Sequence, residues 1–182
     1  MDEKKSGSSV ALTLTVLAAL LRLVPHPPNF APVGAVAIFG GARLRGWQAY
    51  FIPLLAMAVT DPILSHMAGY SAYSLGTIVV YLSFMISVLL GRVFLQHTAN
   101  PVRIGTVALA GSAQFFVVTN LFTWAAGSMY AHTTAGLAEC YIAALPFFGR
   151  TVLADLFYSG VLFTAYELLK RRVSHPTHTQ TA

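Results

Sequence analysis

Residues 73–95 read YSLGTIVVYLSFMISVLLGRVFL, and Arg92 is the only charged residue in this stretch. A helix needs about 20 mostly apolar residues to cross the hydrocarbon core of a bilayer. A run of this length and composition therefore predicts a transmembrane helix. The whole chain of 182 residues is 56% hydrophobic and only 9% charged, whereas soluble domains carry about 25% charged residues. The sequence thus indicates an integral membrane protein embedded in the lipid bilayer.

Six further apolar segments lie on either side of this run. Residues 30–42 are too few to cross a bilayer unless the segment is tilted, extended or shielded by protein. Residues 137–148 are also few, and Pro146 interrupts them. We expect this second short segment to be a re-entrant or interfacial piece that leads into the last helix. The six segments cover residues 10–24, 30–42, 47–67, 104–126, 137–148 and 151–169.

These segments predict an all-α integral membrane protein, a compact bundle of about six transmembrane helices. Residues 1–182 would form a single membrane domain, with a cytoplasmic tail over residues 1–9 and a disordered tail over residues 173–182. The length leaves no room for a separate soluble catalytic domain.

Lysine and arginine set the expected orientation, because cytoplasmic loops carry an excess of them. They occur in the N-terminal tail, at residues 43–45, at residues 92 and 103, and at residues 170–172, and only Arg22 and Arg150 fall near the outer face. The alternating loops contain neither residue, which predicts six crossings with both termini in the cytoplasm. The formal net charge of +5 is accounted for by these segment ends and does not indicate nucleic-acid binding. The loops without lysine or arginine are residues 25–29, 66–72 and 127–135.

In this topology, polar and ionisable residues gather toward the extracytoplasmic end of the bundle. Such residues inside a membrane are costly and typically mark functional sites. The gathered residues are Arg22, His26, Asn29, Asp61, His66, Asn120, Trp124, His132, Glu139, Cys140 and Asp155. We predict a substrate-binding pocket lined by His26, Asn29, Asp61, Asn120, Trp124, His132 and Asp155.

Arg22 lies at the outer end of the first predicted helix. An arginine in hydrocarbon costs about 2.5–3.5 kcal/mol on insertion scales, so it needs a partner or water. We predict a structural ion pair with Asp61 or Asp155, the two acidic residues well inside predicted spans. The alternatives are that the side chain reaches the outer interface or that it contacts an anion in a pocket.

Two other features could form walls of the pocket. Three prolines stiffen residues 25–29, PHPPN. A stiff loop would hold His26 and Asn29 against a ligand with little loss of entropy. The alternative is that this segment is only a tight turn between two helices. Asn120 and Trp124 are four residues apart and share a helix face. Trp124 would offer a ring for stacking, or would belong to the aromatic belt at the interface.

Signals for catalysis are weak. His26, His66 and His132 could hold a metal ion, but no two of them have a compact ligand spacing on one segment. Cys140 with His132 as a base would make a nucleophile, yet no third member is evident. The chain has no P-loop, no H-E-x-x-H and no G-x-S-x-G motif. We therefore expect neither an enzyme nor a resident cofactor.

The run RLVPHPPNFAPVGA at residues 22–35 resembles the opening signature of a bacterial family of small membrane proteins of unknown function. Residues 39–42, 53–61, 119–120, 130, 132–133 and 140–155 look like that family too, so the resemblance covers almost the whole chain. The family in turn is similar to the substrate-binding S components of energy-coupling factor (ECF) vitamin transporters, which are six-helix proteins of about this size.

The resemblance implies capture of a small molecule, vitamin-like or metal-containing, at the extracytoplasmic face of a bacterial inner membrane. Its partners would be an ECF-type transmembrane coupling protein and ATPases. The chain departs from S components in one respect: their alanine-x-x-x-alanine docking motif lies on the first helix, whereas Ala31 and Ala35 lie in the second segment. Two alternatives stay open, a structural or assembly subunit without a ligand and a membrane enzyme that uses Cys140 and His132.

Overall fold

The computed structural model describes residues 2–69, 71 and 73–174. All regular structure in these residues is helical, as the sequence predicts. The helices are α1 (Asp2–Leu21), α2 (Val33–Arg43), α3 (Gln48–Ala68), α4 (Leu75–Leu95), α5 (Pro101–Ala126) and α6 (Thr134–Ser174).

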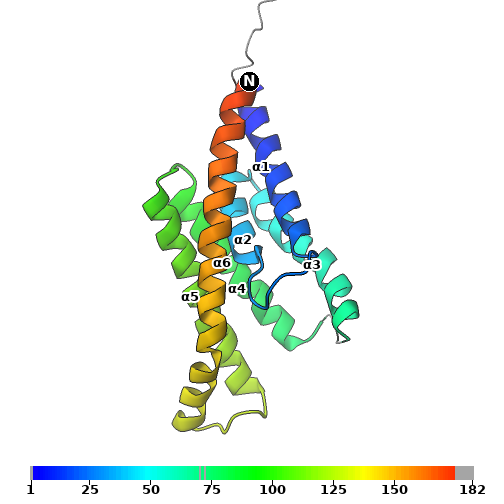
Figure 1. Cartoon of the computed structure of the whole chain (residues 1–182), viewed down its shortest axis with the longest axis vertical. Helices are drawn as coiled ribbons and strands as arrows, with labels where there is room; N and C mark the ends of the chain where they lie inside the picture. The colour runs from blue at the N-terminus through cyan, green and yellow to red at the C-terminus, as the bar shows by residue number, and fades with distance from the viewer. Residues whose placement is uncertain (1, 70, 72, 175–182) are drawn as a thin grey trace, which may run out of the picture.

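The long helix α6 runs along almost the full height of the molecule (Figure 1). Helix α1 packs beside the C-terminal half of α6, so α1 begins at the end of the bundle where α6 finishes. We call this the terminal end. Helix α5 turns into α6 at the opposite end of the molecule, which we call the hairpin end.

The short helix α2 occupies the centre of the bundle and contacts every other helix. Its residues from Gly34 to Ala42 are all buried. Two glycines permit its close approach to α4: a Cβ at Gly41 would overlap the carbonyl of Val88, and a Cβ at Gly91 would overlap the carbonyl of Ile38. Protein therefore shields this segment on all sides, which is the condition under which so few residues can lie within a membrane.

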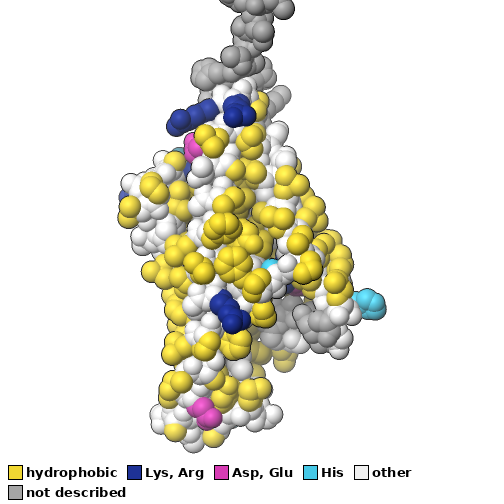
Figure 2. Space-filling view, viewed as in Figure 1, with side chains coloured by type: hydrophobic (Ala, Val, Ile, Leu, Met, Phe, Trp, Pro, Cys, Tyr) yellow, Lys and Arg dark blue, Asp and Glu magenta, His cyan; other side chains and the backbone are white. Residues whose placement is uncertain are grey.

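Helices α3, α4, α5 and α6 are long and apolar enough to cross a membrane, whereas α1 and α2 contribute shorter apolar stretches. Hydrophobic side chains cover much of the side of the bundle, and Lys and Arg side chains appear near the terminal end (Figure 2). Such a surface suits contact with lipid, which indicates a membrane protein.

The expectation that residues 137–148 form a re-entrant piece separate from the last helix is wrong. These residues belong to the single helix α6 of 41 residues, which continues through Pro146. Proline removes one backbone hydrogen bond but need not end a helix that neighbours support. Here Tyr141 and Phe148, on either side of Pro146, both pack their rings against Phe116 of α5.

The helix ends differ from the sequence expectations in smaller ways. Helix α1 begins at Asp2, so the segment expected as a tail over residues 1–9 is largely helical. Residues 173 and 174 belong to α6, and the remainder of the expected C-terminal tail lies outside the described residues.

Candidate functional site

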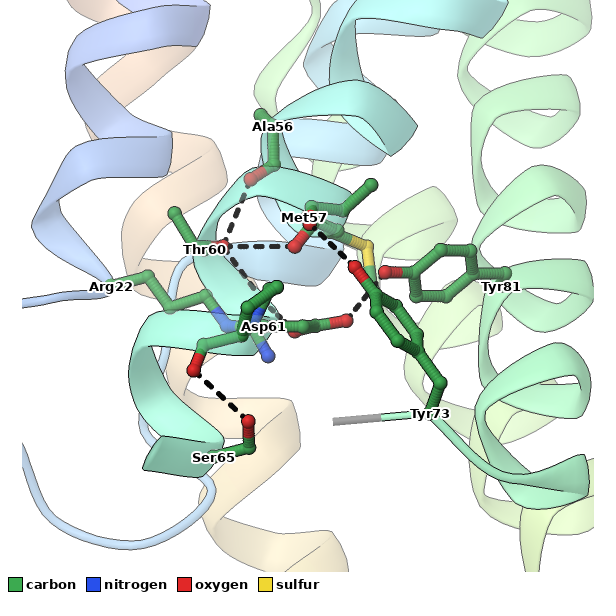
Figure 3. Close-up of polar contacts among 10 residues, drawn as sticks. Arg22, Ala56, Met57, Thr60, Asp61, Ser65, Tyr73 and Tyr81 are labelled. Carbon is green, nitrogen blue, oxygen red and sulfur yellow. Dashed lines mark hydrogen bonds and ion pairs between the residues drawn. The ribbon is translucent and has the colours of Figure 1, made fainter. Parts of the chain in front are cut away.

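Arg22, in the loop that follows α1, forms an ion pair with Asp61 of α3 (Figure 3). Arg22 Nη1 lies 2.5 Å from Asp61 Oδ1 and donates a hydrogen bond of 3.0 Å to Thr60 Oγ1. The Tyr81 hydroxyl of α4 donates to the other carboxylate oxygen, Asp61 Oδ2, at 2.6 Å. The structure thus gives Arg22 one of the two acidic partners expected from the sequence.

This cluster fixes the positions of three segments relative to one another. The Thr60 hydroxyl donates to the carbonyl of Ala56 at 2.9 Å, which leaves its oxygen free to accept from Arg22. Tyr73, before α4, donates to the carbonyl of Ala58 at 2.9 Å. The Arg22 and Asp61 side chains are only 20% and 13% exposed. Each charge is therefore neutralised by the other, and the pair ties the end of α1 to α3 and α4.

Asp155 of α6 is 4% exposed and lies against the first turn of α2. Its Oδ2 accepts a hydrogen bond of 2.7 Å from Ser112 Oγ of α5, and its carboxylate lies against Gly34 in that turn. Helix α2 begins after Pro32, which provides no side-chain cap. Asp155 thus places a carboxylate from another helix at the N-terminus of α2, where negative charge is favourable.

A pocket of about 440 Å³ opens beside Asp155. We call it the loop pocket, because the loop before α2 contributes to its wall together with α2, α3, α4, α5 and α6. Apolar residues such as Phe84 and Phe115 form part of the wall. The polar and charged lining residues are Arg22, His26, Asn29, Ser87, Thr151 and Asp155.

A second pocket of about 320 Å³, the side pocket, lies between the same loop, α5 and α6. It shares Asn29, Phe115 and Thr151 with the loop pocket, so the two pockets adjoin. Asn120 also lines the side pocket, and its Nδ2 donates to the carbonyl of Phe116 at 2.8 Å. Together the pockets form a recess with a few polar groups among aromatic and aliphatic side chains.

The loop that borders both pockets is held in place. Phe30 packs its ring against Tyr158 at 5.7 Å and Phe157 at 6.2 Å between ring centroids. His26 Nδ1 lies 2.7 Å from the carbonyl of Val24. Asn29 has a φ of 62°, a left-handed conformation that asparagine adopts more readily than most residues. The loop therefore presents Asn29 to both pockets from a fixed backbone.

Trp124 and His132 pack against each other near the α5–α6 turn, with ring centroids 5.7 Å apart. Trp124 Nε1 donates to the carbonyl of Ala131 at 2.9 Å, and His132 Nε2 lies 3.1 Å from the carbonyl of Gly127. Neither residue lines the loop pocket or the side pocket. Asp61 does not line them either, although its partner Arg22 does.

The thiol of Cys140 is buried, and its Sγ lies 3.5 Å from the carbonyl of Asn120. The contacts of His132 are with Trp124 and Gly127 instead, so the described contacts do not join Cys140 to His132. In the part of the chain that the structure describes, no three His, Cys, Asp or Glu side chains are grouped so that they could hold a metal ion.

Ser112, Thr151 and Tyr81 contribute to these sites without having been predicted from the sequence. Each is a polar residue within an apolar helix, which is the signal that could have singled them out. Their partners lie on other helices, and sequence spacing alone does not reveal them.

Comparison with known families gives one match. A model of the family of unknown function DUF6580 matches residues 3–178. The chain belongs to DUF6580. No curated protein and no solved structure matches the chain. The matched residues of this DUF6580 protein include the Arg22–Asp61 pair, the Asp155 anchor of α2 and the lining of both pockets.

Proposed function

We propose that this DUF6580 protein captures a small molecule in the loop pocket and the adjoining side pocket. The observation that carries the proposal is the recess around Asn29, because it combines aromatic walls with a few fixed polar groups. Volumes of about 440 and 320 Å³ are of the order of known ligand pockets, which are mostly apolar with a small number of placed polar groups.

The spacing of basic residues along α6 supports a position for the recess at the membrane boundary. Arg150 is exposed, and twenty residues separate it from Lys170. At about 1.5 Å per residue this stretch spans roughly 30 Å, the thickness of the hydrocarbon core. The pocket residues Thr151 and Asp155 follow Arg150 within about one and a half turns, where a ligand from water would arrive.

The orientation follows from the same residues. The terminal end carries most of the Lys and Arg of the described chain, so the positive-inside rule assigns it to the cytoplasm. The proposal is therefore six crossings of a bacterial inner membrane, with both termini in the cytoplasm and the recess on the extracytoplasmic side. The protein would act in uptake, as S components do.

The ligand would be a compact, partly apolar molecule, vitamin-like in size. Arg22 and Asp155 already have protein partners, so Asn29, His26 and Thr151 are the better candidates for polar contacts with it. Phe84 and Phe115 offer ring faces. The chain has no P-loop, so energy for uptake would come from partner proteins. The proposed partners are an ECF-type coupling protein and its ATPases.

Native mass spectrometry of protein purified gently from its native membrane tests the proposal. Thr151→Phe should fill the place where the two pockets meet, whereas Thr164→Phe changes an exposed position on the same helix. We expect a bound non-lipid molecule on the wild type and on Thr164→Phe, and its loss from Thr151→Phe. Equal retention by both variants would contradict the assignment of this recess.

One observation favours a second candidate function, that of an assembly subunit. The hairpin beyond Arg150 exposes large apolar side chains, including Met129 at 77% and Ile142 at 66% exposed. Beyond the hydrocarbon core such groups would suit contact with a partner protein. Gel electrophoresis of membranes under native conditions, with Ile142→Lys against Val173→Lys at an exposed position of the terminal end, would detect such an assembly.

A further inference from the structure

The terminal end carries a further hollow, with several basic residues in its lining, that the proposed capture of a ligand does not use. Its volume is about 670 Å³. The start of α1, the loop between α2 and α3, the end of α4 and the end of α6 surround it. We call it the terminal hollow. Its basic lining residues are Arg43, Arg45, Arg92, His97 and Lys170, and none of its lining residues is acidic.

Arg43 forms the fixed floor of this hollow. Its Nη1 and Nη2 donate to the carbonyls of Leu95 and Thr98, each at 2.7 Å, and its guanidinium lies 4.8 Å from the ring centroid of Phe163. Nη2 also lies 3.3 Å from Glu167 Oε1. The buried Nε has no hydrogen-bond partner among the described residues. The protein thus holds this cation firmly without saturating its donors.

Arg92 is held in a similar way. Its Nη1 donates to the carbonyl of Leu44 at 3.0 Å, just after α2 ends. Carbonyls at helix C-termini carry partial negative charge and stabilise such cations, but they do not cancel the full positive charges of Arg43, Arg92 and Lys170. Glu167, as the partner of Arg43, offsets one of them. The described groups around the hollow therefore leave a net positive charge.

We propose that the terminal hollow binds a phosphate group. A cluster of arginine and lysine side chains favours an anionic phosphate over a neutral ligand, because each N–H directed at an anionic oxygen makes a charge-assisted hydrogen bond. The volume exceeds that of a bare phosphate ion, so the phosphate would carry a further group. Both a phospholipid headgroup and a soluble phosphate compound have this chemistry, and basic pockets between transmembrane helices bind anionic headgroups.

The test uses the full chain in detergent after delipidation, with two probes. One is phosphatidylglycerol, compared with phosphatidylcholine, added as mixed micelles; the other is inorganic pyrophosphate. Arg45→Gln combined with Lys170→Gln removes two charges from the hollow. Arg103→Gln combined with Arg171→Gln removes two exposed charges from the same end outside the hollow, which makes it the matched control. Circular dichroism and gel filtration verify that both proteins fold.

The proposal expects saturable binding of at least one probe by the wild type and the control, and affinity about tenfold or more weaker in the hollow variant. Binding of phosphatidylglycerol that pyrophosphate does not displace would identify a lipid headgroup as the source. Saturable binding of pyrophosphate without binding of phosphatidylglycerol would identify a soluble phosphate compound. Equal loss in the two variants, or binding of neither probe by the wild type, would overturn the proposal.

Discussion

The carboxylate of Asp155 occupies the space that a Cβ at Gly34 would fill. This relationship joins the buried acid of α6 to the first turn of the central helix. It assigns Asp155 a structural role at the start of α2 before any role toward a ligand.

Gly34→Ala should destabilise the protein, because the added Cβ would overlap Asp155 Oδ1. Overpacking of a filled interior costs about 1–3 kcal/mol. Thermal unfolding in detergent measures the effect. Gly160→Ala is the control, since a Cβ there meets nothing within 4 Å; a melting temperature as low for Gly160→Ala as for Gly34→Ala would argue against the contact.

Ser112→Ala and Asp155→Asn should show energetic coupling in a double-mutant cycle. Each single change disturbs the 2.7 Å hydrogen bond between Ser112 Oγ and Asp155 Oδ2, and a buried group left without its partner costs about 1–3 kcal/mol. The double variant should lose less stability than the sum of the two singles. Strict additivity of the unfolding free energies would mean that the two side chains do not interact.

Arg22→Ala should destabilise the fold more than the exposed Arg150→Ala. The change would leave Asp61 as a largely buried carboxylate without its cation. Breaking a fully buried pair costs about 3–5 kcal/mol. The loss should be smaller here, because both side chains are partly exposed to water. Tyr81→Phe should cost only about 1 kcal/mol, because Arg22 would still neutralise Asp61. Thermal unfolding in detergent ranks the three variants, and equal losses for Arg22→Ala and Arg150→Ala would refute the pair's role.

Both termini should be cytoplasmic. Alkaline phosphatase fused after the C-terminus should then be inactive in cells, and the same enzyme inserted after Met129 at the hairpin end should be active. The reason is the distribution of Lys and Arg, which concentrates at the terminal end. An active C-terminal fusion would reverse the proposed orientation and place the recess on the cytoplasmic side.

The sequence predicts the long helices well. The expected spans over residues 47–67 and 73–95 agree with α3 and α4 to within about two residues, because long apolar runs are local signals. Helix α6 was not predicted as one element, because Pro146 is a local sign of a break. The contacts of Tyr141 and Phe148 with Phe116 that support the continuous helix are tertiary.

The lining of the two pockets was predicted only in part. His26, Asn29, Asn120 and Asp155 do line the two pockets, since their positions near one end of the spans are readable from the sequence. Trp124 and His132 lie outside the lining because the unbroken α6 extends the hairpin past the recess. The choice of Asp61 over Asp155 as the partner of Arg22 depends on how the helices rotate about their axes, which residue spacing does not determine.

The central claim is that the recess around Asn29 is reached from outside the cell and is occupied by a small molecule. Cys140, the only cysteine, is buried, so Ala31→Cys in the wall of the loop pocket can be labelled selectively in intact cells with a membrane-impermeant maleimide. We expect labelling from outside that slows when small molecules extracted from the purified protein are added, while labelling of the exposed Ser128→Cys stays unchanged. Labelling of Ala31→Cys only after the membrane is permeabilised, or equal rates with and without the extract, would contradict the account.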